Sequence, residues 1–310
     1  MENQSVHALE YVIKEESKQK NQYIPNKNSS PTRELPLAEY CVNKEDNLNP
    51  RYTFESFVVG PFNELAHAAA QAVIKNLGIT YNPFFVYGNT GHGKTHLIQA
   101  IGNAVKAISP AKKVFYLTSE KFQNDFVSSM LANNIPQFKD KYRKYDVLIM
   151  DDIQFLSGKE KTQEELFHLF NSMKENNKHI VFSSDKHPNF ISGLEDRLKS
   201  RFSAGMVIDI PAPDHESRVA IIKTKCSSIN LFIDDELVDY LADSIRGNIR
   251  DLEGVINIIV CQTETKNKTL TLNEVKELVK NSIKQKKLLS YKEVVKIISD
   301  FFFCPNQDGD

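Results

Sequence analysis

A glycine-rich stretch constrains this chain more than any other feature. Residues 88–95 read GNTGHGKT, with Gly88, Gly93, Lys94 and Thr95 at the spacing G-x-x-x-x-G-K-[ST] and a further glycine at Gly91. The apolar run FFVY before it is typical of a buried strand, and a helical pattern follows it. Glycine N–H groups and a helix N-terminus can both face phosphate. The stretch therefore predicts a nucleoside triphosphate site, with Lys94 on the phosphates and the Thr95 hydroxyl on Mg²⁺.

Alternating patterns around this stretch indicate an α/β fold. Between residues 51 and 211, helical patterns separate five short runs rich in β-branched and aromatic residues: PFFVYG, KVFYLTS, DVLIMDD, HIVFSS and MVIDIP. Such alternation is typical of a parallel sheet with helices on both faces. After residue 211 only helical patterns follow. We predict a nucleotide-binding domain over residues 51–211 and a small helical subdomain over residues 212–272.

Composition and charge narrow the function classes. The chain has 310 residues, 41% hydrophobic and 25% charged, as in a globular protein of more than one structural unit. Its net charge of -1 means that nucleic acid would have to bind local basic patches. The four cysteines lack metal-ligand spacing, and we find neither a secretion signal nor an apolar run near the about 20 residues of a membrane span. We therefore expect a cytoplasmic protein with reduced thiols. Residues 1–50 are polar and predict a flexible tail or linker.

Two acids follow the apolar run DVLIM, at Asp151 and Asp152. At the end of a buried strand beside the phosphate loop, Asp151 would suit the magnesium shell and Asp152 could polarise an attacking water. The alternative is a pair of solvated acids that cap the next segment. Asp152 stands where many ATPases carry the longer glutamate, so slow turnover is expected.

Two further sets of polar residues suit a phosphate site. Ser184 and Asp185 end the run HIVFSSD, where polar groups would face the γ-phosphate. In EDRLKSRF, Arg197 and Arg201 lie four residues apart on one helical face. Either arginine could reach the nucleotide of a neighbouring subunit. The alternative is a solvated helix face.

Taken together, five segments closely resemble the bacterial chromosomal replication initiators of the DnaA family, which are AAA+ ATPases. The resemblance runs in unbroken order over roughly residues 50–290 and rests on these segments: YNPFFVYGNTGHGKTHLIQAIGN, VLIMDDIQFLSGKEKTQEELFHLFN, FSSDKHP, LEDRLKSRF and IRGNIRDLEGVIN. The D-D-I-Q and L-x-x-R-L-x-S-R-F patterns are specific to this family and its close relatives. A generic phosphate loop would not share them.

The resemblance implies roles for individual residues. Asp151 and Asp152 would be the Walker B pair, and Asp185 would be sensor 1. Arg201 would be the arginine finger that acts on a neighbouring subunit, with Arg197 beside it. Arg250, in the helical lid over residues 212–272, would be sensor 2 and contact the nucleotide. Its alternative is an exposed first-turn residue of a helix.

The resemblance also implies how adenine and DNA would be bound. YTFESFVVGPFNELAHAAAQAV looks like the family's adenine cradle, with Asn63, Val58 and Val59 near the base. Residues 119–146 resemble the extra helix pair of initiators. Members of the family bind single-stranded DNA inside an ATP-dependent spiral, and the matching positions are Val127, Lys159 and Lys161. Without the family context, the loop GKEK could equally be a solvated loop.

The end of the chain departs from the family pattern. A linker helix over residues 273–290 is expected, and acidic phospholipids are a further candidate partner for its lysines Lys284, Lys286 and Lys287. Residues 291–310 resemble only the first helix of the family's duplex-reading helix-turn-helix domain. We read them as the truncated start of that domain, so binding of duplex origin repeats is doubtful.

The sequence therefore predicts an ATP-binding replication initiator. It would assemble with further copies on origin DNA, help to open the duplex, and use slow ATP hydrolysis to ADP as a switch, with the replicative helicase as a candidate partner. The alternative is an AAA+ helicase loader or initiator regulator without origin recognition.

Overall fold

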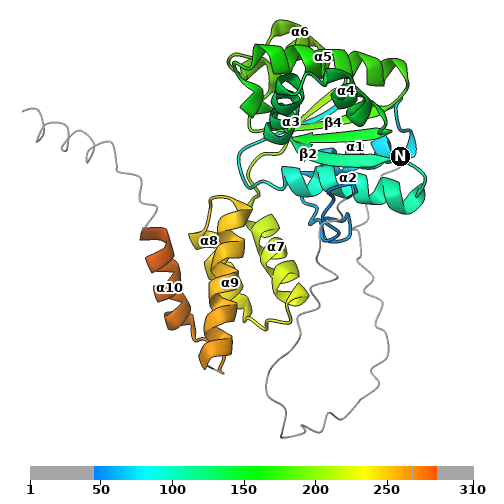
Figure 1. Ribbon diagram of the computed structural model, residues 1–310. Helices are drawn as coiled ribbons and strands as arrows, with labels where there is room; N and C mark the ends of the chain where they lie inside the picture. Colours follow the sequence, from blue (N-terminus) through cyan, green and yellow to red (C-terminus); the bar gives the residue numbers. More distant parts are fainter. Residues whose placement is uncertain (1–44, 267, 285–310) are drawn as a thin grey trace, which may run out of the picture. The chain divides into compact units, whose positions relative to one another are not determined.

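A computed structural model describes residues 45–266 and 268–284, and in this range the chain folds around a five-stranded parallel sheet (Figure 1). All five predicted runs form strands. They are β1 (Phe84–Tyr87), β2 (Val114–Thr118), β3 (Val147–Asp151), β4 (His179–Ser184) and β5 (Met206–Asp209). Their order in the sheet is β2-β3-β4-β1-β5, and each neighbouring pair is parallel. The predicted α/β fold is confirmed.

The central strands are buried along their whole length. Every residue of β3 and β4 is buried, and the centres of both strands, VLIM in β3 and IVF in β4, are apolar. This pattern arises when helices cover both faces of a parallel sheet, so that successive side chains on opposite faces all meet a core. In β1, for example, Phe84 and Val86 enter one apolar cluster while Phe85 enters the other.

One face of the sheet is covered by α1 (Glu64–Lys75) and α2 (Lys94–Ile108). Ala66 and Ala70 of α1 and Leu97 and Ile98 of α2 join the strand residues in one buried cluster. The small alanines allow α1 to approach closely. In Figure 1, α2 runs along this face of the sheet. Because α2 begins at Lys94, this packing fixes the phosphate loop that precedes it.

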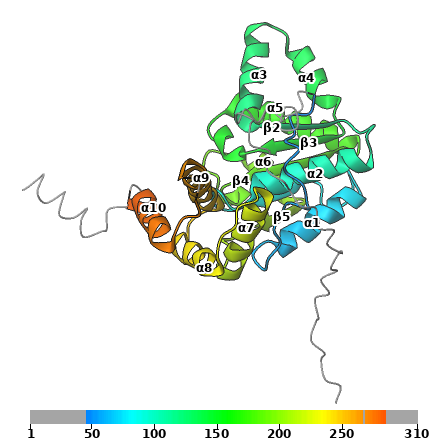
Figure 2. The same ribbon diagram turned by 90° about the horizontal axis from the view of Figure 1, so that it is seen from below.

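The opposite face carries four helices and two short 3₁₀ helices. They are α3 (Ser119–Leu131), α4 (Ile135–Arg143), η2 (Ile153–Leu156), α5 (Glu160–Glu175), η3 (Pro188–Phe190) and α6 (Asp196–Ser203). Their apolar residues form the second cluster with the sheet. Figures 1 and 2 show α3 and α4 beside each other on this side. Asp125 of α3 joins the pair, since it accepts a hydrogen bond from Tyr142 Oη at 2.8 Å and pairs with Lys141, both on α4.

Four helices follow the sheet. They are α7 (His215–Ser228), α8 (Asp235–Ser244), α9 (Ile249–Lys266) and α10 (Leu272–Lys284). They share a third apolar cluster, which includes Val275 and Val279 of α10. The buried Arg218 ties α7 to α8, because its guanidinium donates to Ala242 O at 2.8 Å and Pro213 O at 2.7 Å. The region predicted as a helical lid is thus helical, and the first part of the predicted linker helix packs with it.

Some predictions fall wholly or largely outside the described residues. These concern the N-terminal tail, the start of a DNA-binding domain over residues 291–310, and the side chains of Lys284, Lys286 and Lys287. Near the start of the described range, Leu48 is buried and Asp46 O accepts a hydrogen bond from Tyr116 N at 2.8 Å. The folded part therefore includes residues just before position 51. Within the described ranges, no helix combines the length and apolar character needed to cross a bilayer.

His179, the first residue of β4, is buried and neutral. Its Nδ1 accepts a hydrogen bond from Gly78 N at 3.1 Å, and its Nε2 has no hydrogen-bond partner among the described residues. Burial disfavours the imidazolium and lowers the pKa of His179 to about 4. The unfolded chain, with the ordinary value of 6.5, binds this proton first.

We predict that His179→Asn makes the stability of the protein less sensitive to acid. In the native protein, this histidine alone removes about 2 kcal/mol of unfolding free energy between pH 7 and pH 5, and more as pH falls towards 4. Asparagine can still accept from Gly78 N and does not titrate. Urea unfolding at pH 7 and pH 5 measures the difference. The exposed His168, replaced by Asn, is the control for the loss of a histidine at the surface. Equal acid sensitivity of the His179 variant and the native protein would refute the assignment.

Candidate nucleotide-binding site

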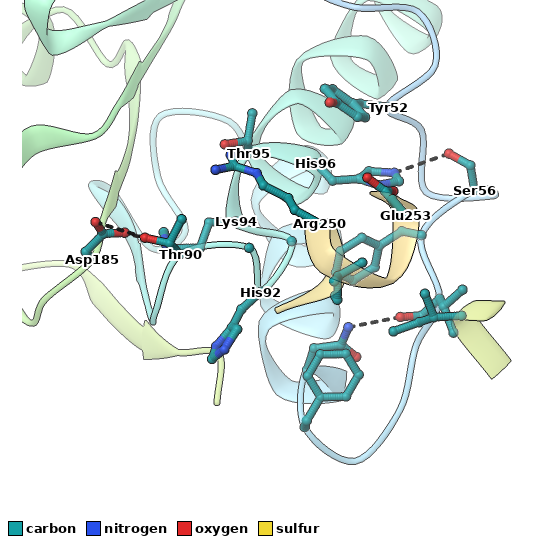
Figure 3. A pocket seen from close by; sticks show the side chains of 18 of the residues that line it. Tyr52, Ser56, Thr90, His92, Lys94, Thr95, His96, Asp185, Arg250 and Glu253 are labelled. Carbon is teal, nitrogen blue, oxygen red and sulfur yellow. Dashed lines mark hydrogen bonds and ion pairs between the residues drawn. The ribbon is translucent and has the colours of Figure 1, made fainter. Parts of the chain in front are cut away.

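A pocket lies at the carboxyl ends of β1, β3 and β4, where ligands bind in open parallel sheets. The segment Thr90–Thr95 forms one wall, and Asp152, Gln154 and Asp185 lie at the strand ends. Arg250 of α9 also lines the pocket. Figure 3 shows Arg250 extending towards the side where Thr95 lies, and Thr90 hydrogen-bonded to Asp185. The predicted phosphate, Walker B and sensor residues therefore come together here.

The phosphate loop needs its glycines. Gly91 and Gly93 have φ angles of 81° and 90°, in the left-handed region that side chains rarely adopt. A Cβ atom on Gly91 would lie 2.5 Å from Asn248 Cβ, so the loop and the start of α9 approach each other too closely for a side chain. Gly93 is the N-cap of α2, and the free N–H groups of the first helical turn follow it. This is the arrangement that binds phosphate.

The side chain of His92 connects the phosphate loop to the edge of the sheet. Its ring Nδ1 lies 2.8 Å from Ile210 O, just after β5, and the side chain is buried. The loop is therefore held at its start by β1 and in its middle by this contact with the residue that follows β5, the edge strand of the sheet.

Lys94 is a buried charge held by three acceptors. Its side chain is 6% exposed, and Nζ donates to Asp185 Oδ1 at 2.8 Å, Gly88 O at 2.6 Å and Asn89 O at 3.0 Å. A buried ammonium needs such partners because it has lost its hydration. Three acceptors hold Nζ at the pocket, where the phosphates of a nucleotide would lie.

Asp151 is buried at the end of β3 and accepts three hydrogen bonds. The donors are Thr95 Oγ1 at 2.8 Å, Tyr116 Oη at 2.9 Å and Ser183 Oγ. Burial, followed by the charge of Asp151, raises the pKa of Tyr116 above its ordinary range, so this phenol stays a donor. The carboxylate is thereby fixed beside the first turn of α2.

The Thr95 and Asp151 pair fits a magnesium site. Mg²⁺ takes oxygen ligands, keeps several waters, and is held by one or two carboxylates together with nucleotide phosphates. A threonine hydroxyl and a carboxylate 2.8 Å apart at the phosphate end of the pocket supply the protein's share of such a shell.

Asp152 and Asp185 are linked by one amide. Gln154 Nε2 donates to Asp152 Oδ1 at 3.0 Å and to Asp185 Oδ2 at 3.2 Å, while Gln154 Oε1 accepts from Asp185 N at 3.2 Å. Asp152 has a left-handed φ of 60°, which turns its side chain from the strand into the pocket. Burial, then the charge of Asp151, raises the pKa of Asp152, and the bond from Gln154 opposes this rise. The Asp152 carboxylate therefore lies in the pocket with a raised pKa and one amide donor.

The opposite end of the pocket is apolar and aromatic. Val58 and Asn63 line it, as expected, whereas Val59 is not among the lining residues. The amide of Asn63 is used within the loop, since Nδ2 donates to Val58 O at 2.9 Å and Oδ1 accepts from Gly60 N at 2.9 Å. Asn63 therefore shapes the loop that would cradle the base. Tyr52 and His96 also line the pocket, with their rings tilted against each other and the ring centroids 5.0 Å apart.

The start of α9 is bonded directly to the phosphate loop. Ile249 N donates to Gly91 O at 3.0 Å, one residue before the exposed Arg250. Glu253, one turn later, pairs with Lys225 of α7 at 2.6 Å, and both line the pocket. Arg250 thus belongs to a helix whose position is coupled to the loop.

The remaining predicted site residues lie elsewhere. Arg197 and Arg201 are on α6 and do not line the pocket. Both guanidinium groups lie over the ring of Phe167 on α5. The predicted DNA-contacting residues are a partly buried valine on α3 and two exposed lysines at the start of α5, namely Val127, Lys159 and Lys161.

Three residues with evident roles in the site were given none from the sequence. Gln154 links the two acids, and Tyr116 and Ser183 hold Asp151. Gln154 lies within the D-D-I-Q pattern, two residues from Asp152, which was a usable signal. No sequence spacing connects Tyr116 to Asp151, because their contact depends on the pairing of β2 with β3.

Comparisons with known proteins agree with the geometry. A family model described as the bacterial DnaA ATPase domain matches residues 48–209. The chromosomal replication initiator protein DnaA of Geobacter sulfurreducens is 44% identical over 257 residues, which is 83% of this chain and 58% of that protein. The chain therefore spans little more than half the length of this curated relative.

Solved structures are similar as well. Domain III of the Thermotoga maritima replication initiation protein DnaA matches with a TM-score of 0.74 and 44% identity, over 76% of this chain and 99% of that one. A replication initiator DnaA bound to AMPPCP and single-stranded DNA matches with a TM-score of 0.68 and 37% identity, over 86% of this chain and 78% of that one.

With Asp152 as the base proposed below for ATP hydrolysis, we predict that Gln154→Ala moves the acid limb of that reaction to higher pH. The substitution removes the hydrogen bond that opposes the raised pKa of Asp152, so a larger share of the carboxyl is protonated and cannot accept a proton from water. Single-turnover hydrolysis from pH 5 to pH 9 measures the shift, and the loss of rate is largest at the acid end of this range. Nucleotide affinity stays within about threefold, because no phosphate contact is lost.

Asp152→Asn is the control for this experiment. It abolishes the acid limb together with most of the hydrolysis, since the amide has no titrating group. A pH profile of Gln154→Ala that superimposes on that of the native protein would contradict the role given to Gln154.

Proposed function

We propose, since this chain belongs to the bacterial DnaA ATPase family, that it binds ATP and assembles with further copies of itself on single-stranded DNA. Family membership confirms the expected relationship, and the likeness to domain III of a solved DnaA agrees with the predicted AAA+ fold. What we propose is that ATP binding drives assembly and that ATP hydrolysis reverses it.

The observation that carries ATP binding is the set of contacts at Lys94. Its Nζ is held by Asp185, Gly88 O and Asn89 O at the phosphate loop. Phosphate oxygens of a bound triphosphate would replace these acceptors, and Asp185 would be freed to face the γ-phosphate. The protein thus exchanges one set of charged contacts for another, with little new desolvation of the lysine.

Hydrolysis would be slow and would act as the switch. Thr95 and Asp151 are the residues that would hold Mg²⁺, which neutralises developing phosphate charge when bound. Asp152 would take the proton of the attacking water, with Gln154 holding its carboxylate. A shorter aspartate at this position keeps the base farther from the phosphate than a glutamate would. The nucleotide then persists long enough to control assembly.

The arginines point to a second subunit. Arg201 does not line the pocket of its own chain, and it is only partly buried on α6. A guanidinium there can reach phosphate only in another copy, where it would both sense the triphosphate and stabilise charge in the transition state. Arg250 would contact the nucleotide within the same chain.

DNA contact is assigned to the loop before α5 and to α3. Lys159 and Lys161 are exposed, and neither forms an ion pair within residues 45–266 and 268–284. Free lysines on an exposed surface can follow a phosphate backbone without reading its sequence. A DnaA of similar structure is bound to single-stranded DNA. Val127 would add an apolar contact.

Three further activities are proposed only because the chain belongs to this family: opening of the origin duplex, binding of the replicative helicase and binding of acidic phospholipids. No contact described above supports any of the three.

We predict that Arg201→Ala weakens ATP-dependent assembly while ATP still binds. Sedimentation of the native protein on a dT oligonucleotide shifts to larger species with ATP and not with ADP. The variant loses charge-assisted contacts to the neighbour's nucleotide, so half-assembly requires on the order of 10- to 100-fold more protein. Its ATP affinity, measured by calorimetry, stays within about threefold. Lys94→Ala is the control that fails to bind nucleotide, and assembly of Arg201→Ala at the native concentration would exclude this role.

We predict that the double substitution Lys159→Ala and Lys161→Ala weakens binding to single-stranded DNA in a salt-dependent way. Loss of two phosphate contacts lowers the slope of log affinity against log salt by about 1.4. Fluorescence anisotropy between 50 and 300 mM salt measures the slope. The exposed pair Lys112 and Lys113, replaced by Ala in the same way, is the control with an unchanged slope. Equal slopes for both double variants would remove the lysines of α5 from the DNA surface.

A further inference from the structure

Two arginines of α6 share one aromatic ring of α5. Arg197 Cζ lies 4.9 Å and Arg201 Cζ 5.6 Å from the centroid of the Phe167 ring. Both distances fall within the about 6 Å over which a cation is attracted to a ring face. The two residues are four apart on one helix, so a single ring on the neighbouring helix can serve both.

The two arginines differ in their partners. Arg197 Nε pairs with Glu195, which balances its charge. No carboxylate of the described residues pairs with Arg201, and its guanidinium donates no hydrogen bond to any of them. The ring face attracts the Arg201 cation without using its N–H donors. All five donors therefore remain available to an anion from outside the chain.

The ring itself is well supported. Phe167 is partly buried and packs against the second apolar cluster, with the buried Leu166 and Phe170 beside it on α5. Leu198 and Phe202 of α6 are buried in the same cluster. Both helices are therefore fixed by the core, and the relative position of ring and guanidinium is fixed with them.

We propose that Phe167 is a positioning residue that holds the Arg201 guanidinium, with its donors free, for the triphosphate bound by a second copy of this chain. The Glu195–Arg197 pair supports this arrangement because it removes net positive charge beside Arg201 that would oppose it. An arginine already restricted by the ring loses less side-chain freedom when it reaches the neighbour's phosphate. This inference rests on the proposed ATP-dependent assembly.

The test compares substitutions of Phe167 that keep or remove the aromatic face. Phe167→Tyr keeps the ring, whereas Phe167→Leu and Phe167→Met keep an apolar side chain without one. Assembly on a dT oligonucleotide with ATP is measured by sedimentation over a range of protein concentrations, with Arg201→Ala alongside. Tyr240→Leu is the matched control, since it removes a cation–ring contact of 5.4 Å to Lys276, far along the chain from α6. ATP affinity and melting temperature are measured for every variant, and the Met variant serves if the Leu variant does not fold.

We expect assembly to depend only on whether residue 167 has an aromatic ring. Phe167→Leu and Phe167→Met raise the concentration for half-assembly by about two- to fivefold, the factor expected for an exposed cation–ring contact. Phe167→Tyr and Tyr240→Leu remain within error of the native protein, and ATP affinity is unchanged throughout.

Three other results would overturn a part of the argument. Native-like assembly of the Leu or Met variant beside a defective Arg201→Ala refutes the role of Phe167 and leaves the proposed function intact. Equal loss in the Tyr variant assigns the effect to packing and refutes it too. Native-like assembly of Arg201→Ala refutes the proposed function itself.

Discussion

The ion pair between Lys94 and Asp185 joins the phosphate loop to the end of β4, and the rest of the site is arranged around it. Lys94 is the first residue of α2, so the pair also fixes where that helix begins. An ammonium that is 6% exposed is stable only with acceptors close by, and here they are a carboxylate and two loop carbonyls. Phosphate oxygens could replace them because they are negatively charged hydrogen-bond acceptors. The contact that stabilises this loop is therefore also the one that a nucleotide would use.

A network of hydrogen bonds extends from this pair to the other acids. Gln154 connects Asp185 to Asp152, and Thr95 connects the first turn of α2 to Asp151. Each carboxylate accepts at least one hydrogen bond from the chain, which offsets the repulsion among three negative charges that lie close together. Ile249 N, at the start of α9, donates a hydrogen bond to Gly91 O, so the position of α9 depends on the position of the phosphate loop. A movement of the phosphate loop would therefore be passed to the strand ends and to α9, each through one hydrogen bond.

The proposed assembly surface around Arg201 is separate from this network, and its charges are arranged differently. At the phosphate end of the pocket, Lys94 and the three acids each have a hydrogen-bond partner within the chain, whereas Arg201 has only the ring of Phe167 among the described residues. A cation held by an aromatic face remains able to bind an anion, because the face does not occupy its N–H groups. The chain thus has buried, paired charges at the phosphate end of its pocket and, on α6, an arginine without a paired carboxylate among the described residues, which is the group proposed to bind a neighbour's nucleotide. This asymmetry favours head-to-tail association of identical copies.

Local patterns in the sequence determined the strands, most helices and the phosphate loop, because strand and helix periods and the glycine spacing act over a few residues. Lys94, Thr95, Asp151, Asp152 and Asp185 could be named from it for the same reason, since each lies directly at the end of a strand or in the loop itself. The tertiary structure alone decided which groups hold these residues. Tyr116 meets Asp151 only because β2 pairs with β3, and Phe167 meets Arg201 only because α5 and α6 pack on one face of the sheet. Contacts between residues far apart in the chain depend on strand order and helix packing, which no short stretch of sequence encodes.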